Sequence, residues 1–322
     1  MTTPNSIIWI DDNPDRAPTA AALGAKFIDV KGEDLAQKVD NLLSGSPPAL
    51  VVLDHILDKT TTTNPLFQRG STIAEAVKEK WPSCPVVGVT NARRVEEIDR
   101  RTKGTYDALY PFSDFRKYLN RITPMRLGFA NVSKAKVRKA LDLIEFLKSP
   151  DDERERLVAA LPEDLKKSFK DASLASRLYR WVDHLMCRPG FLLDSLSAAT
   201  LLGLNDEGFK IVVRLFSKAK YNGVFARDDE PRWWSSRLSE LLYKQSKPME
   251  GEMSWQTGAR LPRIKGKHLS RCYVCKLPYP ETVGYLDEAS TDRRAMHLRC
   301  TVLHPKFQRE LYFEDIRMMK GE

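Results

Sequence analysis

Two short apolar runs near the start of the chain each end on aspartate. The run 7–10 is followed by Asp11 and Asp12, and the run 49–53 is followed by Asp54. Such runs are typical of buried strands in a parallel sheet, which places its chemistry at the carboxyl ends of its strands. Three carboxylates are therefore expected to converge at one edge. Because like charges repel at close range, the pattern predicts a hard divalent cation such as Mg2+ among them.

Strands and helices alternate through the rest of the first 125 residues. Apolar periodicity predicts further strands over 27–30, 85–90 and 106–110, and helices over 34–43, 71–81, 95–102 and 115–122. Strands that alternate with helices predict an α/β fold: a doubly wound, parallel, five-stranded domain with right-handed crossovers.

The order of the polar residues that end these strands resembles the receiver domain of bacterial two-component response regulators. In that family an acidic pair after the first strand binds Mg2+, and an aspartate that ends the third strand accepts a phosphoryl group. A Thr or Ser that ends the fourth strand contacts the phosphate. Asp11 and Asp12, Asp54, and Thr90 match these positions in order. The resemblance implies that Asp54 is the phosphoacceptor, that Thr90 contacts the phosphoryl group, and that Asp11, Asp12 and Asp54 bind Mg2+.

Two features depart from the family pattern. The family usually carries a Lys-Pro pair after the fifth strand, whereas this chain has Tyr110-Pro111. A phenol donates one hydrogen bond but cannot neutralise a dianion, as the lysine does. The stretch 58–70 is also longer than the loop of the family at this position. Two readings stay open: a receiver that is phosphorylated, and a degenerate one that binds partners without chemistry.

Length, composition and charge limit the remaining options. With 322 residues and 42% hydrophobic content, the chain is long enough for two or three domains. No apolar stretch approaches the ~20 residues of a membrane span, and no basic-then-apolar leader opens the chain. We therefore expect a cytoplasmic protein without membrane association. Its five cysteines, an odd number, do not suit a disulfide framework.

The positive charge is unevenly distributed along the chain. Residues 1–125 hold 16 basic and 16 acidic residues, so the remaining 36 basic and 27 acidic residues carry the whole net charge of +9. This excess fits an acidic partner such as DNA. A modest excess spread over about 200 residues is more often an ordinary solvated surface.

The middle of the chain, 133–247, is predicted to be a helical module. The predicted helices lie over 137–147, 165–169, 175–186, 191–202 and 209–218. The stretch 199–214 has the spacing of a helix-turn-helix, in which four basic residues would face phosphates: Lys210, Arg214, Lys218 and Lys220. An ordinary helical hairpin with a glycine turn at Gly203 gives the same pattern. The Pro-, Gly-, Ser- and Gln-containing stretch 246–263 predicts a linker.

The C-terminal segment 264–322 carries a spacing typical of metal ligands. Cys272 and Cys275 are separated by 21 intervening residues from His297 and Cys300. Three thiolates and one imidazole suit tetrahedral Zn2+, and four protein ligands leave no open position, so the site is predicted to be structural. His304 is an alternative fourth ligand to His297. The two pairs flank a predicted hairpin and precede a predicted helix toward Leu311, an order that resembles the treble-clef zinc fingers.

Together these features predict three parts: a receiver-like domain over 1–125, the helical module over 133–247 and a small zinc-binding α+β module over 264–322. The expected function is response-regulator-like signalling rather than enzymatic turnover, with a sensor histidine kinase or other signalling protein as partner. Two alternatives remain: a DNA-binding transcriptional regulator, and a component of a stress or phage-defence pathway.

Overall fold

The structure is a computed structural model of the chain. It describes residues 6–30, 35–57, 69–91, 98–187, 190–247, 252, 254–277, 282–286, 293–297 and 300. The chain divides into two compact units, one formed by 1–139 with 162–181 and the other by 140–161 with 182–322. The three domain ranges expected from the sequence remain a prediction, because a compact unit is not by itself a part that folds alone.

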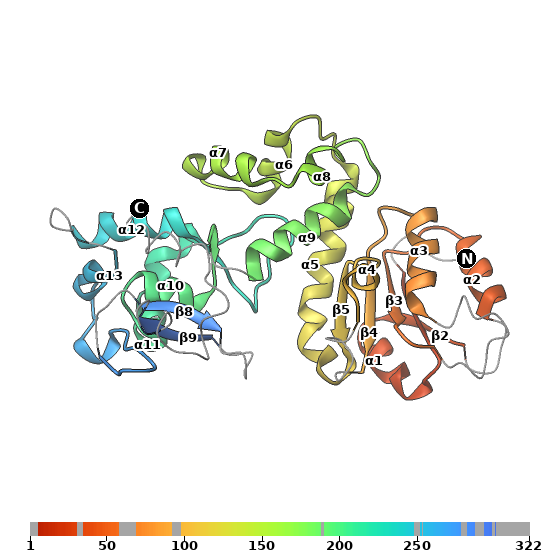
Figure 1. Cartoon of the computed structure of the whole chain (residues 1–322), viewed down its shortest axis with the longest axis horizontal. Coiled ribbons are helices and arrows are strands. Elements are labelled where there is room, and N and C mark those ends of the chain that lie inside the picture. The colour runs from red at the N-terminus through yellow and green to blue at the C-terminus, as the bar shows by residue number, and fades with distance from the viewer. Residues whose placement is uncertain are drawn as a thin grey trace. The chain divides into compact units, whose positions relative to one another are not determined.

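The first unit is built around a parallel sheet, as predicted. Its strands are β1 (Ile7–Asp11), β2 (Ala25–Asp29), β3 (Leu50–Asp54), β4 (Val86–Thr90) and β5 (Ala108–Pro111). They lie in the order β2-β1-β3-β4-β5, and every neighbouring pair is parallel (Figure 1). This is the flavodoxin-like order of doubly wound folds, in which ligands bind at the carboxyl ends of the strands. All residues of β1, β3 and β4 are buried, which explains their uninterrupted apolar sequence.

Helices flank this sheet. They are α1 (Ala17–Ala22), α2 (Leu35–Leu43), α3 (Gly70–Lys80), α4 (Arg100–Lys103) and α5 (Phe115–Lys134), with short 3-10 turns η1 (Pro14–Arg16) and η4 (Phe112–Asp114). Two of the predicted helices differ most from those in the structure. The helix expected over 95–102 begins at Arg100, while 92–97 lie outside the described residues.

Helix α5 does not end at residue 122 as predicted, but continues through Pro124 to Lys134. Its buried residues Ile122, Met125, Phe129 and Val132 follow helical spacing on both sides of the proline. Continuous burial of this apolar stripe therefore outweighs the backbone hydrogen bond that a proline removes.

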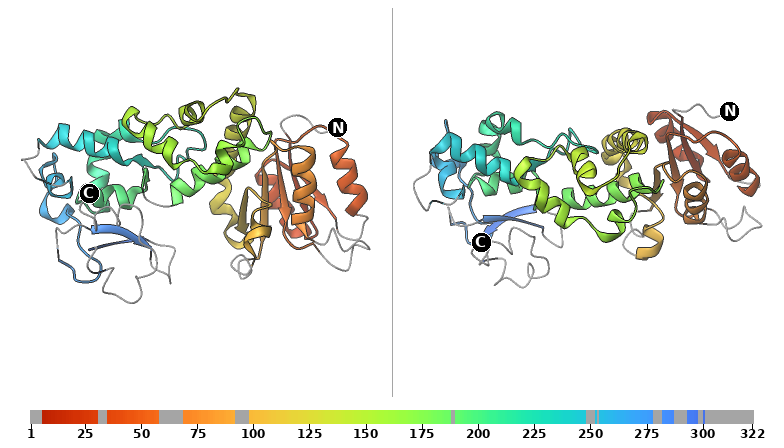
Figure 2. Two further views of the ribbon diagram at one scale, coloured as in Figure 1. Left: turned by 45° about the horizontal axis from the view of Figure 1, so that its top comes forward. Right: turned by 90° about the horizontal axis from the view of Figure 1, so that it is seen from above.

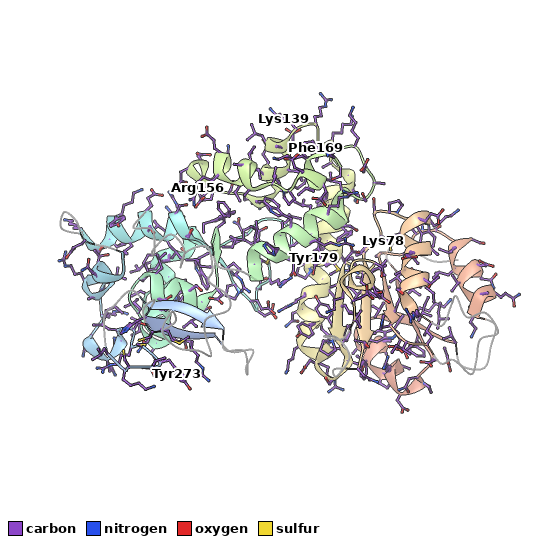
Figure 3. All side chains as sticks on the ribbon, viewed as in Figure 1. Lys78, Lys139, Arg156, Phe169, Tyr179 and Tyr273 are labelled. Atoms are coloured by element: carbon purple, nitrogen blue, oxygen red, sulfur yellow. The ribbon has the colours of Figure 1, made fainter. Side chains whose placement is uncertain are left out.

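The segment 162–181 packs onto the first unit. It contains α8 (Glu163–Lys166) and the first part of α9 (Leu174–Cys187). The rings of Phe129 and Tyr179 lie with their centroids 6.0 Å apart, and Arg180 donates to the backbone carbonyl of Gly104 at 2.6 Å. Figure 3 labels Lys78 and Tyr179 in this region. A stretch expected to belong to a separate helical module is thus part of the packing of the α/β unit.

The second unit is mainly helical. Its elements are α6 (Ala140–Leu147), α7 (Asp151–Ala160), β6 (Leu192–Leu193), α10 (Ser195–Leu201), α11 (Asp206–Val212), η5 (Val213–Ala219), β7 (Trp233–Trp234) and α12 (Ser235–Ser246). The helix expected over 191–202 instead begins at Ser195, because Leu192 and Leu193 pair with the two tryptophans in a short antiparallel ribbon. Asp194 caps α10 by accepting from the backbone N–H of Ser197 at 2.8 Å.

The stretch 246–263 was predicted to be a linker, and its described residues contradict this. They form α13 (Ser254–Thr257) and η6 (Gly258–Arg260), and Leu261 is buried in the same apolar cluster as Leu202 and Leu238. A Cβ on Gly258 would lie 1.6 Å from the carbonyl oxygen of Leu202. The small residues in this stretch therefore allow its backbone to pack closely against the end of α10, and they do not form a flexible linker.

An antiparallel hairpin follows the helical core, at the place where the sequence predicts one. Its strands are β8 (Thr282–Leu286) and β9 (Arg293–His297), paired from Thr282 opposite His297 to Leu286 opposite Arg293 (Figure 2). Both strands contact α10. The helix expected toward Leu311 lies outside the described residues.

Candidate functional site

Three predicted carboxylates meet at the carboxyl edge of the sheet. Asp11 ends β1, Asp12 follows it, and Asp54 ends β3, which is paired directly with β1. One oxygen from each lies within 4.8 Å of the others. Asp11 and Asp54 are buried and Asp12 is half-buried. Thr90, at the end of β4, is buried at the same edge, because the register places Val89 opposite Asp54.

A cation of the chain itself lies among these carboxylates. The Nη1 atom of Arg16 is 3.0 Å from Oδ2 of Asp11 and 2.8 Å from Oδ1 of Asp54, and all three side chains are at most 7% exposed. From the sequence alone, the only counter-charge expected here was a bound metal ion. That expectation was incomplete, because Arg16 supplies one positive charge.

A short turn after β1 brings Arg16 to this position. Asn13 accepts from the backbone N–H of Asp15 at 3.0 Å and so caps the 3-10 turn η1, whose last residue is Arg16. The guanidinium carbon then lies 4.5 Å from the ring centroid of Phe112. Asn13-Pro14 is a turn signal visible in the sequence, although it does not show where the side chain of Arg16 points.

Asp11 is held by further hydrogen bonds. The indole N–H of Trp9 donates to Oδ2 at 3.0 Å, and the backbone N–H of Asn13 donates to Oδ1 at 2.9 Å. These donors and Arg16 favour the ionised carboxylate, whereas burial opposes it more strongly, so the pKa of Asp11 is raised. Both oxygens of Asp11 are thereby fixed in place.

Among the residues that the structure describes, Asp54 has fewer compensating contacts than Asp11. Burial, together with the carboxylate of Asp11, raises the pKa of Asp54 to about 7, although Arg16 acts in the opposite direction. One guanidinium faces two buried carboxylates, so the second retains its proton close to neutral pH. Binding of one more positive charge at this site is therefore electrostatically favourable.

Tyr110, near the end of β5 where the family pattern has a lysine, lies among aromatic rings. It is buried and stacks on Tyr118 with ring centroids 4.3 Å apart and planes at 11°. The rings of Tyr110 and Phe115 meet edge-on, with centroids 6.3 Å apart. Phe115 in turn packs edge-on against Trp9, with ring centroids 5.0 Å apart. Tyr110 thus belongs to an aromatic cluster between β5, β1 and α5, as its apolar ring requires.

The backbone around Asp54 is tightly packed by α3. The N–H of Gly70 donates to the carbonyl of His55 at 3.0 Å, and a Cβ on Gly70 would lie only 2.0 Å from the carbonyl oxygen of Asp54. His55 is buried, with Nδ1 at 3.2 Å from the hydroxyl of Tyr106. Residues 58–68 of the long loop that precedes Gly70 lie outside the described part of the chain.

A second cluster of side chains gathers beside the β8–β9 hairpin. Donor atoms of Cys272, Cys275, His297 and Cys300 all lie within 4.8 Å of one another. Figure 3 labels Tyr273, which lies between Cys272 and Cys275 in the sequence. Zn–S bonds of about 2.3 Å in a tetrahedron place sulfur atoms about 3.8 Å apart, so the donor set fits Zn2+ in both chemistry and size.

The histidine presents a defined nitrogen to this cluster. Nδ1 of His297 lies 3.2 Å from Sγ of Cys275 and 3.7 Å from Sγ of Cys300. The backbone N–H of His297 donates to Sγ of Cys272 at 3.4 Å. Of the two candidates for fourth ligand, His297 is therefore the one placed with the cysteines. His304 lies outside the described residues.

The stretch with helix-turn-helix spacing forms two short helices. Helices α10 and α11 are joined by a turn in which Gly203 has φ of +68°. Lys210 pairs with Asp206 on its own helix, and Lys220 pairs with Asp228. Two of the four basic residues thus have acidic neighbours. DNA binding by this pair of helices remains a prediction.

Comparisons with known proteins give weak likenesses. No protein-family model and no curated protein matches the chain. The chain is similar to solved structures of NtrX from Brucella abortus (18% identity, TM-score 0.27, 62% of this chain and 33% of that one) and of a response regulator from Burkholderia pseudomallei (12%, 0.26, 55% and 97%). A third is the Salmonella typhimurium response regulator RcsB (12%, 0.28, 57% and 100%). The chain spans one third of the NtrX structure, and at these scores none of the likenesses assigns a function.

Among the helices that the structure describes, none is both long and apolar enough to cross a membrane.

Proposed function

We propose that this chain is a response-regulator-like signalling protein whose Asp54 accepts a phosphoryl group. The observation that carries the proposal is the meeting of Asp11, Asp12 and Asp54 at the carboxyl edge of a parallel sheet of receiver order. Thr90 at the end of the adjacent strand supports it, since a hydroxyl there can donate to a phosphoryl oxygen.

In the proposed reaction, a carboxylate oxygen of Asp54 attacks the phosphorus of a phosphohistidine on a sensor kinase. The new O–P bond forms as the P–N bond breaks, and the electron pair stays with the donor imidazole. Asp54 must be ionised to attack, so positive charge beside it promotes the step. Asp11, Asp12 and Asp54 would hold Mg2+, which supplies that charge and shields the transferred group.

We further propose that Zn2+ has a structural role in the second unit, with Cys272, Cys275, His297 and Cys300 as ligands. Four protein ligands close the coordination shell, which leaves no position for a substrate. We accordingly propose that the output of the protein is binding of a partner, not turnover of a small molecule. The cytoplasm, where sensor kinases donate phosphoryl groups, is the proposed location.

Intact-mass measurement after exposure to acetyl phosphate and Mg2+ tests the phosphoryl step. The protein should gain the mass of one phosphoryl group, and Asp54→Asn should gain none. Asp15→Asn is the matched control, because Asp15 is exposed in the turn beside the site and should leave uptake unchanged. Absence of uptake in the unmodified protein would reclassify the domain as a degenerate receiver that only binds partners.

A further inference from the structure

A single nitrogen of Arg16 occupies the space between two carboxylates. Nη1 contacts Asp11 at 3.0 Å and Asp54 at 2.8 Å, which places one positive charge between the two strand ends β1 and β3. These are two of the three side chains that would hold a divalent cation. A metal ion bound to the same two oxygens needs the space in which Nη1 lies.

The guanidinium is held there by more than charge. Arg16 is buried, its chain position is fixed by the capped turn η1, and its guanidinium stacks on Phe112 at 4.5 Å. A guanidinium does not deprotonate in proteins, so Arg16 brings one permanent positive charge into the site.

We propose that Arg16 is the resident counter-ion of the Asp11–Asp54 pair, and that a divalent cation binds only by displacing it. This inference rests on the proposed function and adds its regulation. The receiver is stable without metal, because Arg16 neutralises one carboxylate. Binding of a metal ion then moves the guanidinium out of the site. The positions of Arg16 and Phe112 therefore differ between the metal-free and the metal-bound protein.

Isothermal titration calorimetry of the whole chain with MgCl2, at constant ionic strength, measures the affinity for Mg2+ and so tests this displacement. Arg16→Gln removes the resident charge and should bind Mg2+ about tenfold or more tightly than the unmodified protein, since two charge-assisted contacts no longer have to be broken. Lys117→Gln is the matched control. It also removes one positive charge, but its partner Asp114 is at the surface and its side chain is 76% exposed, so its affinity should be unchanged.

A second variant tests the same idea without touching the carboxylates. Phe112→Leu keeps apolar bulk but removes the ring on which the guanidinium lies. Because a cation–π contact contributes about 0.5–1 kcal/mol, the affinity for Mg2+ should rise about two- to fivefold. This variant retains the ion pairs, so it remains informative if Arg16→Gln does not fold.

The outcomes separate this inference from the proposed function. Equal Mg2+ affinity in the unmodified protein, Arg16→Gln and Phe112→Leu overturns it, as does a lack of Mg2+ binding in all three. Tighter binding in the Arg16 and Phe112 variants supports it. If that tightening occurs and acetyl phosphate still adds no phosphoryl group to any of the proteins, Arg16 is the resident counter-ion of a receiver that is not phosphorylated.

Discussion

Two buried carboxylates and one guanidinium set the properties of the site at the scale of single residues. Asp11 has donors on both oxygens, whereas the donor that the described part of the chain gives Asp54 is the shared Arg16. A buried carboxylate without full compensation prefers its neutral form. Asp54 is thus the residue whose protonation depends most on what else enters the site.

Stability in metal-free buffer should fall as pH rises through the range in which Asp54 titrates. The pKa of Asp54 is about 7 in the folded protein and 3.8 as the ordinary value. Between these values the folded chain keeps a proton that the unfolded chain has released, so the free energy of unfolding decreases as pH increases, by at most about 4 kcal/mol. Urea unfolding at about pH 5 and about pH 7.5 measures this. Asp54→Asn should make the decrease smaller; an unchanged decrease in that variant would contradict the assignment to Asp54.

Gly70 is needed because the backbone of α3 approaches strand β3 too closely for a side chain. In Gly70→Ala the new Cβ would lie 2.0 Å from the carbonyl oxygen of Asp54, and β3 or α3 must move. We expect a loss of about 1–3 kcal/mol in unfolding free energy. Gly266→Ala is the control: a Cβ there meets nothing within 4 Å, and the change should stay within about 0.5 kcal/mol. Similar losses in both variants would show that the contact with Asp54 is not the cause.

The positions of the carboxylates and Thr90 at the strand ends could be predicted from the sequence, whereas the position of Arg16 could not. Asp11, Asp54 and Thr90 each follow an apolar run of the kind typical of a buried parallel strand, so their meeting at one edge follows from the topology. Arg16 follows a turn instead. Its side chain could point to solvent or inward, and only the geometry of the turn and the ring of Phe112 decide between these directions.

At the scale of elements, a buried ion pair ties helix, sheet and the returning segment 162–181 together. Lys78 near the end of α3 pairs with Asp107 just before β5, and it also donates to the carbonyl of Cys84 at 3.0 Å and to the hydroxyl of Ser176 at 2.6 Å. Asp107 in turn accepts from the backbone N–H of Val86 at 2.7 Å. Burial lowers the pKa of Lys78, which the carboxylate of Asp107 partly offsets.

Removal of this lysine should destabilise the first unit strongly. Lys78→Met keeps the length of the side chain but leaves the fully buried carboxylate of Asp107 without its cation. We expect a loss of about 3–5 kcal/mol in unfolding free energy. Lys80→Met on the same helix is exposed and should stay within about 0.5 kcal/mol. Chemical denaturation of both variants compares them, and equal small effects would mean that the pair is not needed for the packing of 162–181.

The elements were predicted well where one pattern dominates and poorly where two compete. The five parallel strands and the hairpin β8–β9 follow from apolar runs between turn signals. Helix α5 continues past Pro124 because tertiary burial outweighs a local breaker. Gly258 and its neighbours were interpreted as a linker because small residues in the sequence look the same whether they permit flexibility or close packing.

At the scale of the whole molecule, the described residues of each compact unit hold one candidate metal site, and the Cys272–Cys300 cluster is joined to the core of its unit. The backbone of Asn205 donates to the carbonyl of His268, and that of Ser270 to the carbonyl of Gly203, both at 2.9 Å. Leu269 is buried with the helices α10–α12, and α10 contacts both strands of the hairpin. The sequence predicts a separate zinc-binding module over 264–322, whereas these contacts connect the first residues of that range to the helical core.

Loss of zinc should therefore weaken the second unit beyond the hairpin and spare the first. We expect about one equivalent of zinc per chain, because ligand binding and folding of so small a segment are linked. Cys275→Ser should lose the metal and reduce protection from hydrogen exchange in α10 and α11 as well as in β8 and β9, while β1, β3 and β4 keep theirs. Cys84→Ala is the control, since Cys84 is buried in the core of the first unit and should leave the zinc content unchanged. Elemental analysis and hydrogen exchange test this prediction. Well under half an equivalent of zinc in protein purified without chelator would contradict it. Unchanged protection of α10 in Cys275→Ser would likewise show that the cysteine cluster does not stabilise this unit through a metal ion.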